Sequence, residues 1–188
     1  MAEHILIHHK LDASKANGPG NRAVIWVQGC TLNCPGCFNP KTHDKNEGTQ
    51  TTVNELFNWL LSLGNSIEGV TISGGEPLQQ LKPVLSLLQR IKAETILTTF
   101  MFSGYTKKEI ETFPQWLALS QALDMLLCGR YDVTHKLESC IVSSSNQEVL
   151  FLTNAYTQFE VDNIPHNEII ILPNGAIVAS GVGGINLE

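Results

Sequence analysis

Three cysteines stand within eight positions of one another, in the arrangement Cys30-x3-Cys34-x2-Cys37. They directly follow an apolar, β-branched run, and the residues around them are rich in glycine, proline and asparagine. Such a turn-forming backbone lets thiolates converge on one centre, whereas an extended strand would point successive side chains to opposite faces. Three thiolates hold three corners of a cubane iron–sulfur cluster and leave one iron without a cysteine ligand. The spacing therefore indicates a cluster whose fourth iron takes a ligand from outside the chain.

A zinc site is the alternative for these cysteines, and it usually requires a fourth cysteine or histidine at short spacing. His43, six residues after Cys37, is the nearby candidate. The two other cysteines lie far along the chain, so the total of five is odd and argues against a closed disulfide framework. We expect Cys128, in an apolar run, to be a small buried residue, and Cys140, in a serine-rich loop, to be a surface thiol.

A second candidate site is the segment Ser73-Gly74-Gly75-Glu76-Pro77, which follows the apolar residues 69–72. Ligands bind at the carboxyl ends of strands in parallel α/β sheets. Two glycines let the backbone come close to a ligand, and Glu76 adds a carboxylate. Taken alone, the segment also fits an ordinary turn between a strand and a helix. In combination with the cysteines, we expect it to belong to the same site.

The elements that must position these two motifs alternate between strand and helix. The expected strands are residues 4–9, 23–28, 69–72, 94–102 and 125–128. The expected helices are residues 53–63, 78–91, 106–112 and 115–123. Thr52 and Glu55 have the spacing of a capping box at the start of the first helix. This succession predicts an α/β fold with a mostly parallel sheet, either open or closed into a partial barrel.

The C-terminal part of the chain has a different pattern, with strands and no intervening helix. Strands are expected at residues 148–152, 159–161, 168–172 and 176–179. Pro173-Asn174-Gly175 has the composition of a hairpin turn between the last two. We therefore expect antiparallel edge strands in this part.

Length and composition fit one domain with a buried core. The chain has 188 residues, of which 43% are hydrophobic, and a net charge of −6. This charge disfavours nonspecific nucleic-acid binding, because no basic field attracts phosphate groups. The apolar runs are far shorter than the roughly 20 residues that span a bilayer. Because the N-terminus also lacks the pattern of a secretory signal, we expect a cytoplasmic protein without a membrane segment.

Residues 28–40, which contain the three cysteines, and residues 71–77, which contain the Gly-Gly-Glu segment, resemble radical S-adenosylmethionine (SAM) enzymes. Residues 18–23, 103–106, 124–131 and 144–147 make the chain similar to the small activating proteins of anaerobic ribonucleotide reductases, which are glycyl-radical-enzyme activases. The resemblance implies a partial (β/α) barrel of the radical SAM type with a mostly parallel sheet and C-terminal antiparallel edge strands. It implies a single domain over residues 1–188, with a core of about 17–153 and a C-terminal β extension of about 154–188.

The resemblance also implies the roles of individual residues. The cysteines Cys30, Cys34 and Cys37 would ligate a [4Fe–4S] cluster, whose fourth iron would be chelated by SAM. The residues expected to contact SAM are Gly74, Gly75, Glu76, Ser103 and Gly104. The first three match the segment that receives the methionine amino group, and the last two lie beside the sugar or sulfonium end. No catalytic residue is implied beyond the cofactors.

The activity implied by the resemblance is a one-electron cleavage of SAM. A reduced flavodoxin or ferredoxin would supply the electron, and the resulting 5′-deoxyadenosyl radical would abstract hydrogen from a glycine of a partner, the anaerobic ribonucleotide reductase. Two alternatives remain: a radical SAM enzyme of the same build that modifies another protein, a peptide or a small molecule, and a non-enzymatic electron-transfer module. The Gly-Gly-Glu segment argues against the second alternative, which requires no SAM site.

Overall fold

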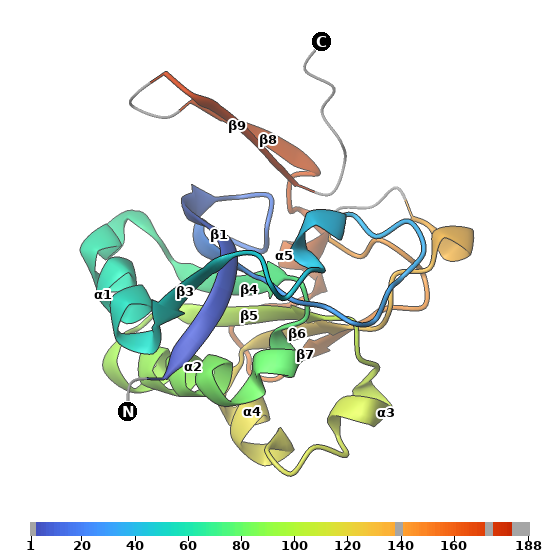
Figure 1. The fold of residues 1–188 in the computed structure, drawn as a ribbon. Coiled ribbons are helices and arrows are strands. Elements are labelled where there is room, and N and C mark those ends of the chain that lie inside the picture. Colours follow the sequence, from blue (N-terminus) through green and yellow to red (C-terminus); the bar gives the residue numbers. More distant parts are fainter. Residues whose placement is uncertain (1–2, 138–140, 172–174, 182–188) are drawn as a thin grey trace.

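A mixed sheet of seven strands forms the centre of the molecule, in the order β3-β1-β2-β4-β5-β6-β7 (Figure 1). The computed structural model describes residues 3–137, 141–171 and 175–181. The four inner strands run parallel and are β2 (Arg22–Val27), β4 (Gly69–Gly74), β5 (Thr98–Ser103) and β6 (Met125–Cys128). The outer strands pair antiparallel and are β1 (His4–Ser14) and β3 (Thr49–Thr52) on one side and β7 (Glu148–Phe151) on the other.

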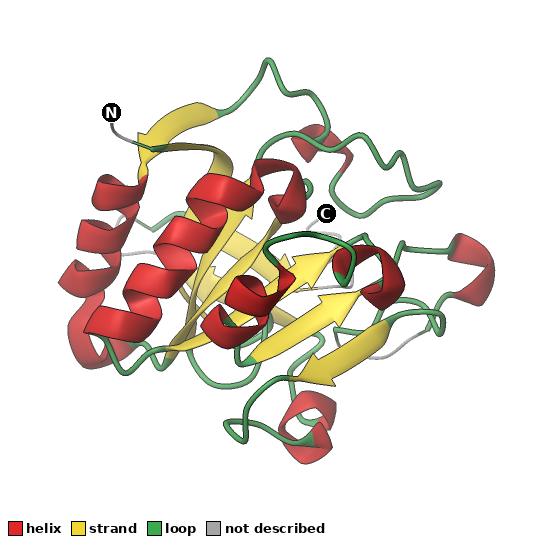
Figure 2. Ribbon diagram, turned by 90° about the horizontal axis from the view of Figure 1, so that it is seen from below, coloured by secondary structure: helices red, strands yellow, loops and turns green. Residues whose placement is uncertain are grey.

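Helices cover one face of this sheet (Figure 2). They are α1 (Val53–Leu63), α2 (Leu81–Glu94), α3 (Lys107–Ile110) and α4 (Trp116–Ala122). The expected capping box is confirmed, because the Thr52 side chain accepts from the Glu55 backbone N–H and the Glu55 carboxylate accepts from that of Thr52. The apolar stripes of α1 and α2 pack on the inner strands, and together they form the larger hydrophobic core.

The other face of the sheet carries the C-terminal part of the chain. It contains α5 (Gln158–Asp162) and a separate antiparallel hairpin of β8 (Asn167–Ile171) and β9 (Ile177–Gly181). Figure 1 shows this hairpin on the opposite side of the sheet from α2 and α4. A second core cluster, which includes Phe100 of β5 and Val161 of α5, fills part of this face.

Most expected elements are confirmed with shifted ends, one differs in kind, and one strand was not predicted. Residues 159–161, expected as a strand, belong to α5, which begins with a capping box formed by Thr157 and Glu160. Strand β3 was not expected, because its sequence, Thr-Gln-Thr-Thr, is polar and lies at the edge of the sheet. The strand expected at residues 94–102 starts later, at Thr98, because α2 continues to Glu94.

The expected α/β fold with a mostly parallel sheet is confirmed. Of the expected C-terminal edge strands, β7 pairs antiparallel at the edge of the sheet, whereas β8 and β9 form a separate antiparallel pair. The partial barrel stays a prediction. The turn at Pro173 and Asn174 and the thiol of Cys140 lie outside the described residues. Among the residues that the structure describes, no helix has both the length and the apolar character needed to cross a membrane.

Candidate iron–sulfur and cofactor site

The three clustered cysteines lie on the loop that leaves the carboxyl end of β2, and all three are partly exposed. They line a cavity of about 130 Å³ together with the carboxyl ends of β4 and β5. The lining includes every residue expected at the cofactor site, namely Cys30, Cys34, Cys37, Gly74, Gly75, Glu76, Ser103 and Gly104. The parallel strands therefore bring together two motifs that are about 40 residues apart in the sequence.

Backbone hydrogen bonds close the cysteine loop at its base. The N–H of Gly29 donates to the carbonyl of Thr42 at 2.7 Å, and the N–H of Cys30 donates to that of His43 at 3.1 Å. The side chain of Thr42 is buried and donates to the Asn39 carbonyl at 2.7 Å. The loop thus keeps its closed shape through bonds of its own chain.

Gln28, at the end of β2 and 1% exposed, attaches the loop to the sheet. Its Nε2 donates to the carbonyls of Lys41 at 3.0 Å and Asp44 at 2.8 Å. The backbone carbonyl of Gln28 accepts from Nε2 of Gln80 at 2.9 Å. The Gln80 amide also donates to the carbonyl of Leu6 and accepts from its N–H. The buried amide of Gln28 and the partly buried amide of Gln80 therefore connect β1, β2, the cysteine loop and the turn after β4.

The arrangement of the cysteines fits a cluster better than a single metal ion. Within the described ranges, no three His, Cys, Asp or Glu side chains converge in the way that one ion requires. The cysteines of a cubane bind three different irons, so they need no such convergence. Burial raises the pKa of Cys30 and Cys37, so a metal that binds these thiols would have to displace their protons.

Glu76 links the ends of two strands instead of pointing a free carboxylate into the cavity. Its side chain is buried, and it accepts from the N–H of Leu78 at 2.9 Å, the Oγ of Ser103 at 2.9 Å and the N–H of Gly104 at 2.7 Å. Burial raises the pKa of Glu76 to about 7, against the opposing effect of these hydrogen bonds. Its carboxylate therefore fixes the end of β5 relative to the Gly-Gly-Glu turn.

The two glycines before Glu76 allow the turn to pack on the cysteine loop. The N–H of Gly75 donates to the carbonyl of Val27 at 2.8 Å, and the N–H of Glu76 donates to that of Gly29 at 2.9 Å. Gly74 has a φ of 103°, and a Cβ there would lie 2.6 Å from the Val27 nitrogen. A Cβ on Gly75 would collide with the carbonyl oxygen of Gly29. Both glycines are thus required by backbone contacts, as well as by any close approach of a ligand.

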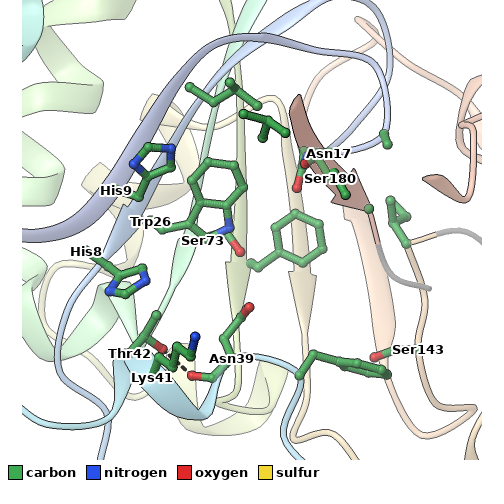
Figure 3. Close-up of a pocket in the computed structure, with 18 of the residues that line it drawn as sticks. His8, His9, Asn17, Trp26, Asn39, Lys41, Thr42, Ser73, Ser143 and Ser180 are labelled. Carbon is green, nitrogen blue, oxygen red and sulfur yellow. Dashed lines mark hydrogen bonds between the residues drawn. The ribbon is translucent and has the colours of Figure 1, made fainter. Parts of the chain in front are cut away.

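A larger cavity of about 600 Å³ is shown in Figure 3. It adjoins the first one, and the two share lining residues such as Ser73 and Phe102. It contains residues that the sequence did not single out for the site. His8 and His9 both face it, although neighbours in a regular strand point to opposite sides. The register of β1 with β2 shifts between Ile7 and His9, and this bulge turns both rings to one side. The ring of His9 stacks on Trp26 with centroids 5.9 Å apart.

The β8–β9 hairpin forms one wall of the larger cavity through residues 178–181. The carboxylate of Glu168 on β8 accepts from the backbone N–H groups of Lys15 at 2.9 Å and Ala16 at 3.3 Å. On β9, Oγ of Ser180 accepts from Nδ2 of Asn17 at 2.6 Å. Polar bonds to the loop after β1 therefore hold the hairpin over the cavity.

Cys128 is buried at the end of β6, with 1% of its surface exposed, and this confirms the expectation for it. Burial raises its pKa to about 11, so the side chain is a neutral thiol at physiological pH. Cys128 is thus separate in character from the three cysteines of the loop.

Comparisons with known proteins agree with this arrangement. A family model described as a 4Fe-4S single cluster domain matches residues 16–150. The anaerobic ribonucleoside-triphosphate reductase-activating protein of Escherichia coli strain K12 is 30% identical over 149 residues, which cover 76% of this chain and 96% of that protein. The corresponding protein of Vibrio cholerae is 32% identical over 130 residues, covering 66% of this chain and 83% of that protein.

Two further similarities are more distant. The pyruvate formate-lyase-activating enzyme of Listeria monocytogenes is 27% identical over 153 residues, which cover 77% of this chain and 60% of that protein. The crystal structure of QueE from Escherichia coli superposes with a TM-score of 0.46 at 17% identity, covering 55% of this chain and 53% of that one. The match to the 4Fe-4S family spans most of the chain, and the chain therefore belongs to this family as a radical SAM enzyme of the activating type, with a [4Fe–4S] cluster and SAM as its cofactors.

Proposed function

We propose that this protein installs a glycyl radical on a partner enzyme, with Cys30, Cys34 and Cys37 as the ligands of its [4Fe–4S] cluster. One observation carries the proposal: the three cysteines share a cavity with the ends of β4 and β5, and this cavity shares lining residues with a larger one. The names of the relatives, which activate an anaerobic reductase or pyruvate formate-lyase, support a glycyl-radical enzyme as the substrate. An anaerobic ribonucleotide reductase is the partner that we favour.

We assign three roles to residues of the chain: binding SAM, positioning the segments that contact it, and shielding the reacting groups. When bound, the cluster and SAM supply one-electron reduction and hydrogen-atom abstraction. We assign the backbone of Gly74 and Gly75 and the β5 end at Ser103 and Gly104 to SAM contacts. Glu76 holds these two segments in register through its bonds to Ser103 and Gly104. We assign to the walls of the larger cavity the shielding of the reacting groups from water, which protects a reactive species from side reactions.

The proposal includes an electron donor and a place in the cell. We infer that a reduced flavodoxin or ferredoxin delivers the electron, since the cysteine loop is partly exposed at the surface. We also propose that residues 1–188 act as a single radical SAM domain in the cytoplasm. The core of this domain would be residues 17–153, and residues 154–188 would be its β extension.

One observation favours a second candidate function. The β8–β9 hairpin lies after residue 150, where the match to the family model ends, and it forms a wall of the larger cavity. A wall outside the matched region can select a different substrate. The second candidate is therefore a radical SAM enzyme of the same build that modifies another protein, a peptide or a small molecule.

The test begins with anaerobic reconstitution of the protein with iron and sulfide. SAM and dithionite are then added, and 5′-deoxyadenosine and methionine are measured. We expect product from the wild type, none from Cys34→Ala, and wild-type product from the matched control Cys128→Ala, whose thiol lies in the core. Product from Cys34→Ala would contradict the ligand assignment.

The second stage adds a purified anaerobic ribonucleotide reductase and records electron paramagnetic resonance (EPR) spectra. A glycyl radical on the reductase supports the proposed partner. SAM cleavage without a radical on the reductase favours the second candidate. An intact cluster that cleaves no SAM with any partner would point to an electron-transfer module instead.

A further inference from the structure

The ring of His43 lies against one of the three clustered cysteines. Its Nε2 is 3.3 Å from the Sγ of Cys37, and the backbone N–H of Asn39 lies 3.4 Å from the same sulfur. A cysteine that ligates iron is a thiolate, whose sulfur can accept a hydrogen bond but has no proton to donate. The Nε2 of His43 must therefore carry the hydrogen and donate it to Cys37.

The backbone holds this ring in place. The carbonyl of His43 accepts from the N–H of Cys30 at 3.1 Å, and its N–H donates to the carbonyl of Pro40 at 3.2 Å. The carbonyls of the two neighbouring residues are also bonded: that of Thr42 accepts from the N–H of Gly29, and that of Asp44 accepts from Nε2 of Gln28. The contact between ring and sulfur thus follows from the closed shape of the loop.

We propose that His43 is a positioning residue that raises the reduction potential of the cluster through its hydrogen bond to the Cys37 sulfur. The inference rests on the proposed function, because it takes Cys37 as a ligand. A reduced cluster carries one more negative charge than an oxidised one, and part of this charge resides on the cysteine sulfurs. A donor at the sulfur therefore stabilises the reduced state more than the oxidised state.

The proposal matters for the reaction because the cluster must accept an electron before SAM can be cleaved. With a donor of fixed potential, the fraction of reduced cluster depends on the potential of the cluster. His43 increases this fraction and is not among the residues that line the two cavities. The alternative, in which His43 is itself a metal ligand as in a zinc site, makes a different prediction about the number of irons bound.

The experiment measures the midpoint potential of the reconstituted cluster by an anaerobic redox titration followed by EPR, before any SAM is added. Four proteins are compared: the wild type, His43→Phe, His43→Gln and His166→Phe. Phenylalanine keeps a flat ring without a donor, whereas glutamine places an N–H near the position of Nε2. His166 is exposed and lies directly before β8, so its substitution is the matched control.

In His43→Phe, we expect the ratio of reduced to oxidised cluster at a fixed potential to fall about tenfold, which is about 59 mV for one electron. His43→Gln should recover most of this ratio, and His166→Phe should equal the wild type. An unchanged ratio in His43→Phe would overturn the proposal. Loss of one iron, or a change of cluster type, would also overturn it, because His43 would then be a ligand.

A second measurement applies if His43→Phe assembles no cluster. Wild-type protein with ¹⁵N-labelled histidine is reduced and examined by pulsed EPR without SAM. A weak nitrogen coupling supports a hydrogen bond to the cysteine sulfur. A strong coupling, typical of nitrogen bound to iron, or no coupling at all, overturns it. Failure of the wild type to bind four irons would instead refute the proposed function, so the two failures are distinguishable.

Discussion

Replacing Glu76 with glutamine changes how the stability of the protein depends on pH. The carboxyl is buried, and burial raises its pKa from 4.5 to about 7. Between these values the folded protein binds a proton that the unfolded chain has released, so folding is favoured at the acidic end. The contribution of Glu76 is fully present below pH 4.5 and is lost as the pH rises through 7. Glutamine has no such proton.

The size of the effect follows from the shift. A shift of one pKa unit corresponds to about 1.4 kcal/mol. As the pH rises from 4.5 to 8, ionisation of Glu76 therefore lowers the free energy of unfolding by about 3 kcal/mol. In Glu76→Gln, the new amide N–H group faces another donor. That donor is the Gly104 N–H or, in the flipped amide, the Leu78 N–H and the Ser103 hydroxyl, and the clash costs about 1–3 kcal/mol at every pH relative to the protonated wild type. The variant should therefore be the less stable protein at pH 5 and close to the wild type at pH 8.

Urea unfolding of the cluster-free proteins under reducing conditions, at several values between pH 5 and pH 8, measures this difference. All other ionisable groups are the same in both proteins, so their contributions cancel in the comparison. Glu47→Gln, at an exposed position of the cysteine loop, is the control and should keep the wild-type slope. Equal slopes for the wild type and Glu76→Gln would refute the argument that burial controls this carboxyl.

Two other substitutions test the contacts around the cavities. Gly75→Ala should lower the free energy of unfolding by about 1–3 kcal/mol, because a Cβ there meets the Gly29 carbonyl; thermal unfolding measures it, and an unchanged Tm would contradict the contact. Glu168→Gln weakens the bonds of the hairpin to Lys15 and Ala16, so we expect faster proteolysis within β8 and β9 with unaltered cluster content. A proteolysis rate equal to that of the wild type would show that other contacts hold the hairpin.

The sequence is informative where the chemistry depends on local spacing. The cysteine loop, the Gly-Gly-Glu turn at the end of β4 and the capping box at Thr52 could all be predicted, because each is encoded within a few residues. Helix α5 had a similar signal, since Thr157 and Glu160 have capping-box spacing, but its apolar residues also fit a short strand.

Features that depend on distant contacts could not be predicted in this way. His8 and His9 face one cavity because β1 bulges against β2, and a bulge is a property of the pairing of two strands. Gln28 connects β2 to carbonyls at Lys41 and Asp44, and nothing in its local sequence indicates those partners. The role of Glu76 as a link between strands likewise requires the neighbouring end of β5.

The closed base of the cysteine loop has a consequence for how the protein responds to oxygen. In small zinc domains the metal itself holds the fold, and chelation unfolds the chain. Here, the bonds that close the loop run between backbone groups, from Gly29 to Thr42 and from Cys30 to His43, and use no cysteine sulfur. We therefore expect a molecule that loses its iron to oxidation to keep its three cysteines gathered and its core intact. Such a molecule can be repaired by reloading iron and sulfide, without having to be made again.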